Sequence, residues 1–534
     1  MLTAPRDLAP FRNEPIRDFS GPRDRASLEA ALARVAGTLG QRYPLIVDGE
    51  PLHGARSIAS VNPAHPAQVI GEVDEATPEQ ASHALDVATA RFETWKQTPA
   101  AERADFLFRA AERVRATRDD WNALLILEVG KTWIEADADT AEAIDFLEFY
   151  GREALRLDAP PPLTPIAGER NQLVYRPLGV GVVIPPWNFA FAIMAGMSAA
   201  AVVTGNTAIL KPSPDAAVIA ARFVMLMHEL GLPPGVLNFV PGDGPTVGEQ
   251  LVTDPRTRFL AFTGSKGVGL RINELAAKTP PGQRWIKRVI AEMGGKDAIV
   301  VADDADLDAA VAGVVAAAFG FAGQKCSACS RAIVDRSVYA AFLEKLVPAV
   351  EALTVGDPAA AESAVGPVIN QKALERILNY VDVGRAEGLL LTGGTRLERD
   401  GYYVAPTVIA DVESRARIAQ EEIFGPVVAV IPADGFDDAL RIANDTEFGL
   451  TGSVYSRSPA RLRQAREEYF VGNLYLNRKC TGALVGGQPF GGFNMSGTDS
   501  KAGGYDYLLL FVQGQSVSEK VAAHAGDDLA AGMD

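Results

Sequence analysis

The sequence predicts an α/β protein built on parallel sheets, and two observations indicate this fold class. Between residues 178 and 291, short apolar stretches of strand length alternate with longer stretches of helical periodicity. A second alternating block covers residues 298–475. Successive β-α units form parallel, doubly wound sheets with crossover helices. A chain of 534 residues is too long for one ordinary core, so we expect two or three domains.

The first half of the chain is predicted to begin with helices and then to alternate. Residues 1–45 have the character of a charged extension, with helical spacing over 24–39. Amphipathic patterns dominate from about 75 to 155, and they predict helices at 79–95, 103–117 and 121–128. Strands are then expected at 178–184, 207–210, 236–240, 259–263 and 289–292. The helices between them are expected at 189–203, 216–231, 246–252 and 267–278.

The second block repeats this alternation. Strands are expected at 298–301, 332–334 and 427–431, and helices at 307–321, 339–353, 371–387 and 437–444. The segment 480–505 is rich in glycine and is predicted to be irregular. The last ten residues have the composition of a frayed acidic tail.

Composition argues against several classes of partner. The net charge is −16 and no run of Lys and Arg occurs, which disfavours nucleic acid and anionic membrane surfaces. Residues 177–210 carry no charge and could span a bilayer by length alone. The pair Pro185-Pro186 breaks this stretch, and the helical piece that remains is too short to span. With no secretory signal at the start and only three cysteines, we expect a cytoplasmic protein.

The most informative stretch is the run GQKCSA at 323–328, which contains Cys326. A cysteine beside a lysine and a glycine can be exposed and electropositive, as a nucleophilic thiolate requires. Cys326 and Cys329 also suggest a zinc or redox pair, but no second such pair exists and no histidine lies between 229 and 523. We therefore expect no metal, and a carboxylate would have to act as the base.

Several polar residues follow predicted strands, where α/β sheets place their ligands. An amide such as Asn188 can stabilise an oxyanion, although it could equally cap a helix. Lys211 could reach a ribose or phosphate, or remain a surface lysine. Gly264 and Ser265 open a helix that could take a pyrophosphate. Glu292, before two glycines, could act as a general base if burial raises its pKa. Glu422 could accept from a ribose hydroxyl or remain a solvent charge.

The order of these motifs is more specific than any one of them. PPWNF, KPS, FTGS, EMGGKD, GQKCSA and EEIFGPV occur in the order and approximate spacing of the NAD(P)-dependent aldehyde dehydrogenases. The sequence resembles that superfamily over about residues 45–515. The run 477–492, the segment 496–504 and the N-terminal extension are similar to those of the 1-pyrroline-5-carboxylate dehydrogenases.

The resemblance implies a role for each candidate residue. Cys326 would be the nucleophile, Glu292 the base for deacylation, and Asn188 with the Cys326 N–H the oxyanion hole. The residues implied at the cofactor are Trp187, Lys211, Ser213, Gly264, Ser265, Glu422 and Phe424. The residues implied at the substrate are Phe189, Ser327, Gly482, Ala483 and Phe490.

The resemblance also implies a fold, a cofactor and an assembly. We expect a Rossmann-type NAD domain, an α/β catalytic domain and a small oligomerisation element that makes at least a homodimer. The corresponding segments are 1–155 (extension and first part of the NAD domain), 156–176 (first part of the oligomerisation element), 177–291 (NAD domain), 292–490 (catalytic domain) and 491–534 (return, oligomerisation strand and tail). Many family members have Glu three residues after the lysine of KPS. This chain has Pro214 there, so NAD is expected but NADP remains possible.

The implied activity is oxidation of L-glutamate 5-semialdehyde to glutamate through a Cys326 thioester, in proline degradation. Two alternatives stay open: an aldehyde dehydrogenase for another carboxylated or aliphatic aldehyde, and a non-catalytic relative that keeps the fold. Asn188, Glu292 and Cys326 together weigh against the last, because binding alone needs none of them. Cys329 and Cys480 have no role in the scheme and are expected to be small buried thiols.

Overall fold

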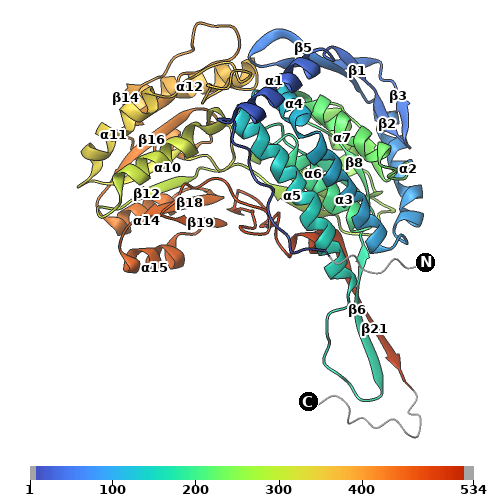
Figure 1. Cartoon of the computed structure of the whole chain (residues 1–534). Coiled ribbons are helices and arrows are strands. Elements are labelled where there is room, and N and C mark those ends of the chain that lie inside the picture. Colours follow the sequence, from blue (N-terminus) through green and yellow to red (C-terminus); the bar gives the residue numbers. More distant parts are fainter. Residues whose placement is uncertain (1–7, 522–534) are drawn as a thin grey trace.

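The computed structural model describes residues 8–521, which form two lobes and a projecting arm (Figure 1). Each lobe is built around a seven-stranded sheet. The predicted α/β class and the two alternating blocks are therefore confirmed. The acidic tail predicted for the last ten residues lies outside the described residues.

The first lobe contains the sheet predicted from residues 178–292. Its parallel strands are β7 (Val180–Ile184), β8 (Thr207–Leu210), β9 (Leu237–Phe239), β10 (Thr257–Thr263) and β11 (Arg288–Glu292). They lie in the order β11-β10-β7-β8-β9, so the order reverses beside β7. The antiparallel strands β2 (Leu45–Val47) and β3 (Glu50–Leu52) extend the sheet beyond β9. A crevice outside the carboxyl ends of such strands is where doubly wound sheets bind ligands.

Helices cover both faces of this first sheet. On one face lie α2 (Pro78–Trp95), α8 (Glu249–Thr253) and α9 (Lys266–Ala277), which bury Leu85, Leu251 and Ile272 against Val182 and Leu260. On the other face lie α6 (Ala192–Val203) and α7 (Ala217–Glu229), in the same core as α3 (Ala100–Ala116). The strand residues alternate between the two cores because successive side chains point to opposite faces.

The N-terminal helices follow their capping signals. Thr77 and Gln80 form a capping box before α2, with Pro78 in its first turn. The next helices are α1 (Pro22–Ala36), α4 (Arg118–Val129) and the long α5 (Trp133–Asp158). Helix α4 ends at Gly130, whose φ of 74° is left-handed, and Thr132 with Glu135 then caps α5. Of these, α5 was not predicted individually, although its buried residues repeat at helical spacing.

The second lobe has the strand order β14-β15-β16-β13-β12-β18-β19. These strands are β12 (Ala298–Val301), β13 (Arg331–Asp335), β14 (Leu389–Thr392), β15 (Thr407–Ala410), β16 (Val427–Ala433), β18 (Thr451–Tyr455) and β19 (Asn473–Leu476). Only β14 is antiparallel to its neighbour. The helices are α10 (Leu307–Phe319), α11 (Tyr339–Glu351), α12 (Gln371–Glu387), α13 (Arg417–Gln420), α14 (Phe436–Asn444) and α15 (Pro459–Glu468).

Three predicted helices differ from the structure where the backbone turns. The helix expected over 189–203 begins only at Ala192, because residues 189–191 still belong to a turn. The helix expected over 307–321 ends at Phe319, because Phe321 and Ala322 have φ values of 53° and 51°. Near 246–252, a π-helical turn, Gly244–Gly248, precedes the short α8.

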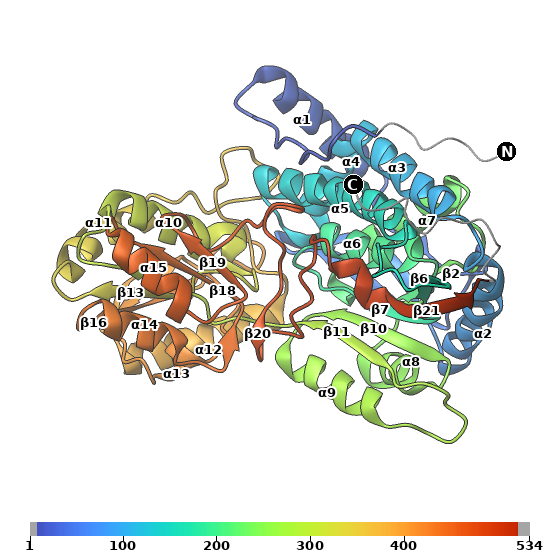
Figure 2. The same ribbon diagram turned by 90° about the horizontal axis from the view of Figure 1, so that it is seen from below.

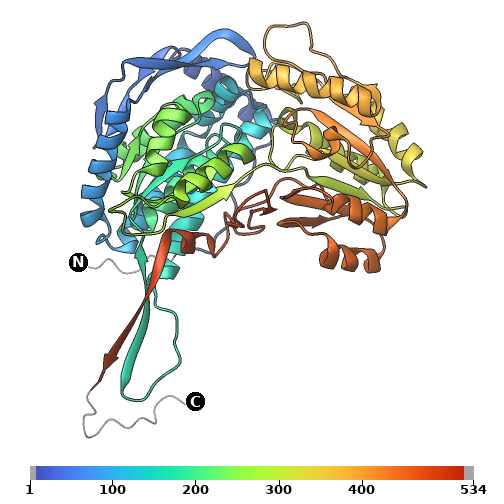
Figure 3. The same cartoon turned by 180° about the vertical axis from the view of Figure 1, so that it is seen from behind.

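Smaller elements connect the lobes and form the arm. Strands β1 (Gln41–Tyr43), β4 (Arg56–Asn62) and β5 (His65–Glu75) make a separate three-stranded sheet. The segment 480–505 is mostly irregular as predicted and passes between the lobes (Figure 2). Its one short strand, β20 (Phe493–Asn494), pairs with β17 (Phe448–Gly449), and isolated bridges join Gly497 to Glu292 and Phe490 to Ala502. Strands β6 (Glu169–Pro177) and β21 (Val512–Lys520) form the arm, which projects away from both lobes (Figure 3). No helix within residues 8–521 is long and apolar enough to cross a membrane.

Candidate active site

Cys326 lies on a strained turn that follows α10. The 3-10 segment Gly320–Gly323 contains three successive left-handed residues, because Gly323 also has a positive φ, of 68°. A Cβ on Gly323 would lie 2.2 Å from the carbonyl oxygen of Gly425, so only glycine fits there. Gln324 then fixes the turn, because its Oε1 accepts from the Ile369 N–H at 2.8 Å. The sequence-predicted nucleophile is thus held rigidly between the lobes and is partly exposed.

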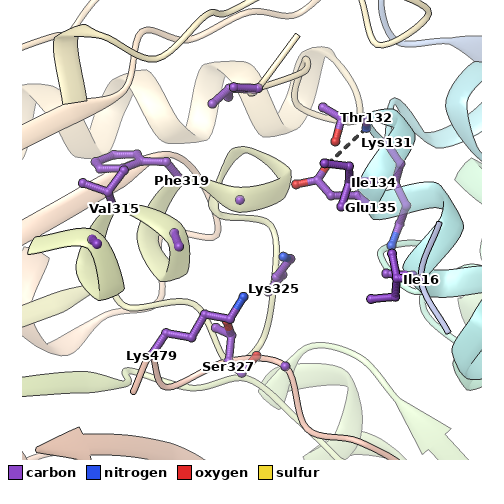
Figure 4. Close-up of a pocket in the computed structure, with 18 of the residues that line it drawn as sticks. Ile16, Lys131, Thr132, Ile134, Glu135, Val315, Phe319, Lys325, Ser327 and Lys479 are labelled. Carbon is purple, nitrogen blue, oxygen red and sulfur yellow. Dashed lines mark hydrogen bonds between the residues drawn. The ribbon is translucent and has the colours of Figure 1, made fainter. Parts of the chain in front are cut away.

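The surroundings of the Cys326 thiol are not electropositive, which corrects the expectation from its neighbour Lys325. Burial raises the pKa of the thiol well above its usual value, and the carboxylates of Asp297, Glu422 and Glu292 raise it further. The Lys325 side chain instead points into a cavity beside the turn (Figure 4). A raised pKa favours the neutral thiol over the thiolate, so attack by Cys326 needs a base that takes its proton.

Asn188 lies beside this turn. Strand β7 ends at Ile184, and the buried Asn188 side chain donates from Nδ2 to the carbonyl oxygen of Gln324 at 3.0 Å. The helix-capping alternative is wrong, because Asp139 accepts the Ala192 N–H at 2.7 Å at the start of α6. The Asn188 amide thus bonds the backbone two residues before Cys326, and an amide N–H can stabilise an oxyanion without titrating.

Glu292 is the last residue of β11 and is almost fully buried. Its Oε1 accepts from Ser500 Oγ at 2.5 Å and from the Ser500 N–H at 3.3 Å. Its Oε2 accepts from the Gly492 N–H at 3.1 Å. Burial raises the pKa of Glu292 to about 7, while these hydrogen bonds oppose the rise. A carboxyl group with this pKa can exchange protons near neutral pH.

The residues predicted at the cofactor lie at the carboxyl ends of the first sheet and on a facing turn. Lys211 follows β8, Ser213 precedes a short 3-10 turn, and Ser265 caps α9 by accepting from the Val268 N–H. Burial lowers the pKa of Lys211 to about 8. The N–H of Gly264 donates to the carbonyl oxygen of Glu292 at 3.0 Å, which links the α9 turn to the base.

The facing turn comes from the second lobe. Glu422 accepts from the Gly295 N–H at 3.1 Å, and a Cβ on Gly294 would lie 2.3 Å from a Glu422 oxygen. The Trp187 and Phe424 rings meet edge to face with centroids 5.7 Å apart. The exposed start of α9, a buried lysine, a carboxylate and an aromatic pair are groups that fit a dinucleotide. Within residues 8–521, no group of three or more His, Cys, Asp and Glu side chains could hold a metal ion.

A cavity of about 1090 Å³ lies on the other side of the nucleophile turn. Of the residues predicted at the substrate, Phe189, Ser327, Gly482 and Ala483 line it, whereas Phe490 does not and instead pairs its backbone with Ala502. In Figure 4 the amino groups of Lys325 and Lys479 extend into this cavity above Ser327. The Cys480 thiol is buried and donates to the Ser327 carbonyl at 3.5 Å, so the 480–483 loop is joined to the nucleophile turn.

Sequence analysis missed the charged groups on the α5 wall of this cavity. The Lys131 ammonium lies 4.4 Å from the centre of the Phe189 ring and 4.7 Å from that of Phe321, and it pairs with Asp139 at 3.1 Å. Burial raises the pKa of Glu142, which also lines the cavity, to about 8. The turn Gly130-Lys131-Thr132 could have drawn attention to Lys131. No helix was predicted after this turn, however, so Lys131 could not be placed near the site. Cys329 is also buried, as expected for a small buried thiol.

Comparison with known proteins decides the family. The model of the aldehyde dehydrogenase family matches residues 52–517. The chain belongs to the aldehyde dehydrogenase family. It is therefore an enzyme, and the resemblance seen in its six motifs is confirmed.

The most similar relatives are of one kind. A protein of Geobacillus kaustophilus called 1-pyrroline-5-carboxylate dehydrogenase is 55% identical over 96% of this chain and 99% of its own length. A structure of the Thermus thermophilus 1-pyrroline-5-carboxylate dehydrogenase R100A mutant superposes with a TM-score of 0.95 at 49% identity, covering 96% of this chain and all of that one. A Thermus structure of the same name contains bound NAD, with the same score, identity and coverage.

Proposed function

We propose that this aldehyde dehydrogenase oxidises L-glutamate 5-semialdehyde, the open form of 1-pyrroline-5-carboxylate, to L-glutamate in proline degradation. The observation that carries the proposal is the cavity beside Cys326. Its wall combines the Ser327 hydroxyl, the exposed Gly482-Ala483 backbone and the amino groups of Lys325 and Lys479. Such a wall suits an aldehyde whose far end is a carboxylate. Relatives more than half identical carry the name of this activity.

The chain's own residues account for the chemistry at the reacting carbon. As Cys326 Sγ adds to the aldehyde carbon, its proton leaves to a base, and Glu292 with a pKa of about 7 suits that task. Asn188 Nδ2 and the Cys326 N–H stabilise the oxyanion. NAD, when bound, supplies the hydride acceptor. Glu292 passes that proton to solvent, takes another from the water that attacks the Cys326 thioester, and returns it to the departing sulfur, which releases the acid and the thiol.

NAD would bind at the carboxyl ends of the first sheet. Lys211 and Glu422 would hold ribose hydroxyls, with Ser213 beside Lys211. The exposed turn of Gly264 and Ser265 would receive the pyrophosphate at the start of α9. Trp187 and Phe424 would bound the nicotinamide. A Thermus relative with bound NAD supports this choice over NADP.

The substrate would bind in the cavity on the other side of the nucleophile turn. Ser327, Gly482 and Ala483 would bind the carboxylate, while Phe189 flanks the aliphatic chain; Phe490, which does not line the cavity, is given no part in it. The carboxyl group of Glu142 faces the same space, and an ammonium group bound there would favour its ionised form.

We also propose a cytoplasmic homo-oligomer, at least a dimer, assembled through the arm. The arm falls in the two segments expected to form the oligomerisation element. The first, 156–176, lies between the NAD-domain segments 1–155 and 177–291. The second, 491–534, follows the catalytic segment 292–490. Leu163, Ile166 and Val517 on it are exposed apolar side chains. A two-stranded ribbon with exposed apolar side chains is marginal by itself, which supports its being covered by a second subunit.

The test compares kcat/KM for glutamate semialdehyde, succinate semialdehyde and hexanal by NADH formation. We expect glutamate semialdehyde to be preferred, and Cys326→Ala to abolish turnover. Ser327→Ala should raise KM for glutamate semialdehyde about ten- to a hundredfold, since it removes one hydrogen bond to a charged group, worth about 1.5–3 kcal/mol. Equal kcat/KM for hexanal would reject the carboxylate site.

A second candidate is an aldehyde dehydrogenase for longer aliphatic aldehydes. It is favoured by the apolar part of the cavity, where Val311, Val315 and Phe319 of α10 face Leu353. The cavity of about 1090 Å³ also exceeds the space that a five-carbon substrate fills. A higher kcat/KM for hexanal in the same assay would select this function.

A further inference from the structure

The N-terminal strap, residues 8–20, is an extended segment to which no role has yet been given. It precedes α1 and runs along α5 as a dark-blue chain toward the segment that passes between the lobes (Figure 1). Its residues make no regular secondary structure up to residue 18. Its hydrogen bonds are therefore made to other parts of the protein.

Asn13 is the centre of these contacts. Its Nδ2 donates to Asp145 Oδ2 of α5 at 2.8 Å and to the Val485 carbonyl oxygen at 2.9 Å. The N–H of Glu14 donates to the other oxygen of Asp145 at 2.7 Å. One side-chain amide thus bridges a rigid helix and the end of the loop that carries Gly482 and Ala483.

Aromatic packing holds the strap to the same loop. The Phe11 ring meets that of Phe149 edge to face, with centroids 5.2 Å apart. A Cβ on Gly486 would lie 3.1 Å from the Phe11 ring, so the ring covers the backbone of the loop directly. Val485 is buried beneath these contacts, whereas Gly482, Leu484 and Gly487 around it are exposed.

The strap also forms part of the cavity wall. Glu14 and Ile16 line the cavity, and Figure 4 shows Ile16 on the side opposite Val315 and Phe319. The Glu14 carboxylate is fixed by Arg115 at 2.9 Å and by the buried Arg118 at 3.2 Å. This wall is therefore anchored on α3 and α4 as well as on α5.

We propose that the strap positions the 482–486 loop for the carboxylate of the substrate, with Asn13 as the positioning residue. Backbone N–H groups bind an anion well only when they are already oriented, since ordering a loop on binding costs free energy. The exposed Gly482, with a φ of 81°, cannot supply this order itself. The inference rests on the proposed function and adds Asn13 to the residues that determine the preference for a carboxylated aldehyde.

The experiment compares Asn13→Ala with Arg12→Ala in the full-length enzyme. Arg12 is the exposed neighbour, and its side chain makes no hydrogen bond within the described part of the chain. We expect Asn13→Ala to raise KM for glutamate semialdehyde about five- to tenfold, as the loss of two buried hydrogen bonds predicts. The kcat for this substrate and kcat/KM for hexanal should stay within about twofold of wild type, because the nucleophile is untouched. Arg12→Ala should resemble wild type.

A second measurement, hydrogen exchange of the amides at 482–486, does not depend on the substrate. We expect faster exchange there in Asn13→Ala and no change in Arg12→Ala. Unchanged exchange, or an equal loss of kcat/KM for both aldehydes, would overturn the role of the strap. A wild-type enzyme without preference for glutamate semialdehyde would instead refute the proposed substrate, and the exchange result would still decide whether the strap orders the loop.

Discussion

At the scale of single residues, the environment of Glu292, the proposed general base, should set the pH dependence of activity. Burial at the end of β11 raises the pKa of this carboxyl group to about 7, so it is mostly protonated below that pH and cannot accept a proton. The Ser500 hydroxyl donates to its charged form, and this bond lowers the pKa. Activity should therefore rise with pH through about 7 as Glu292 ionises.

Ser500→Ala should move that rise to higher pH. The variant loses a hydrogen bond to the ionised carboxylate, so the pKa of Glu292 should increase by about one unit, equivalent to about 1.4 kcal/mol. The measurement is kcat against pH between roughly 5.5 and 9, a range that covers the ionisation of a general base whose pKa is near neutral. Thr498→Val is the matched control, because Thr498 bonds only the backbone of Ala291 and not the carboxylate. An acidic limb at the same pH in Ser500→Ala and wild type would contradict the assignment.

Candidate reactive residues could be proposed from the sequence, whereas the groups that surround them in the structure could not. Cys326, Glu292 and Asn188 could be proposed because each follows a strand or a glycine turn at a recognisable place. Ser500 lies 208 residues from Glu292 in sequence, and no local pattern links the two. Lys131 was missed for the same reason. The raised pKa of Cys326 was also missed, since Asp297 and Glu422 reach the thiol only in the folded chain.

At the scale of elements, the parallel strands were predictable and the turns were not. Strands such as Thr207–Leu210 are short apolar runs whose type follows from burial on both faces. The sequence could not show that α10 stops at Phe319, since Phe321 and Ala322 carry no turn signal and yet are left-handed. Packing of this turn against Gly425 imposes that conformation.

Gly323→Ala should therefore disable the nucleophile turn. The new Cβ would meet the Gly425 carbonyl oxygen at 2.2 Å and would also strain a positive φ, so the turn must shift. A displacement of about 1 Å at a reacting group costs on the order of a hundredfold in kcat. Gly320→Ala is the control, because its Cβ would meet the flexible end of Lys325 at 3.1 Å and lie in ordinary contact with the Glu135 carboxylate at 3.7 Å. The measurements are kcat and the rate of Cys326 alkylation; near wild-type values of both for Gly323→Ala would show that the turn tolerates the change.

At the scale of the whole molecule, the active site needs parts from every region of the chain. The proposed base Glu292 comes from the first lobe, the proposed nucleophile Cys326 and Glu422 come from the second, and Ser500 comes from the segment between them. The strap from the N-terminus closes the cavity on the α5 side. The arm extends away from both lobes (Figure 3), which supports the proposal that it contacts a second subunit.

The arm should assemble the enzyme, and Val517→Lys should weaken that assembly. Strands β6 and β21 pair over nine residues, and Val517 on β21 is 39% exposed in the single chain. If a second subunit covers it, burying a charge in place of this side chain should cost about 1–2 kcal/mol per site, or about tenfold in the dissociation constant. Light scattering at decreasing protein concentration measures the effect. Met225→Lys, which adds the same charge at an exposed apolar position of α7, is the control and should leave the mass unchanged. A monomeric wild type, or equal masses for the two variants at every concentration, would show that the arm does not form the interface.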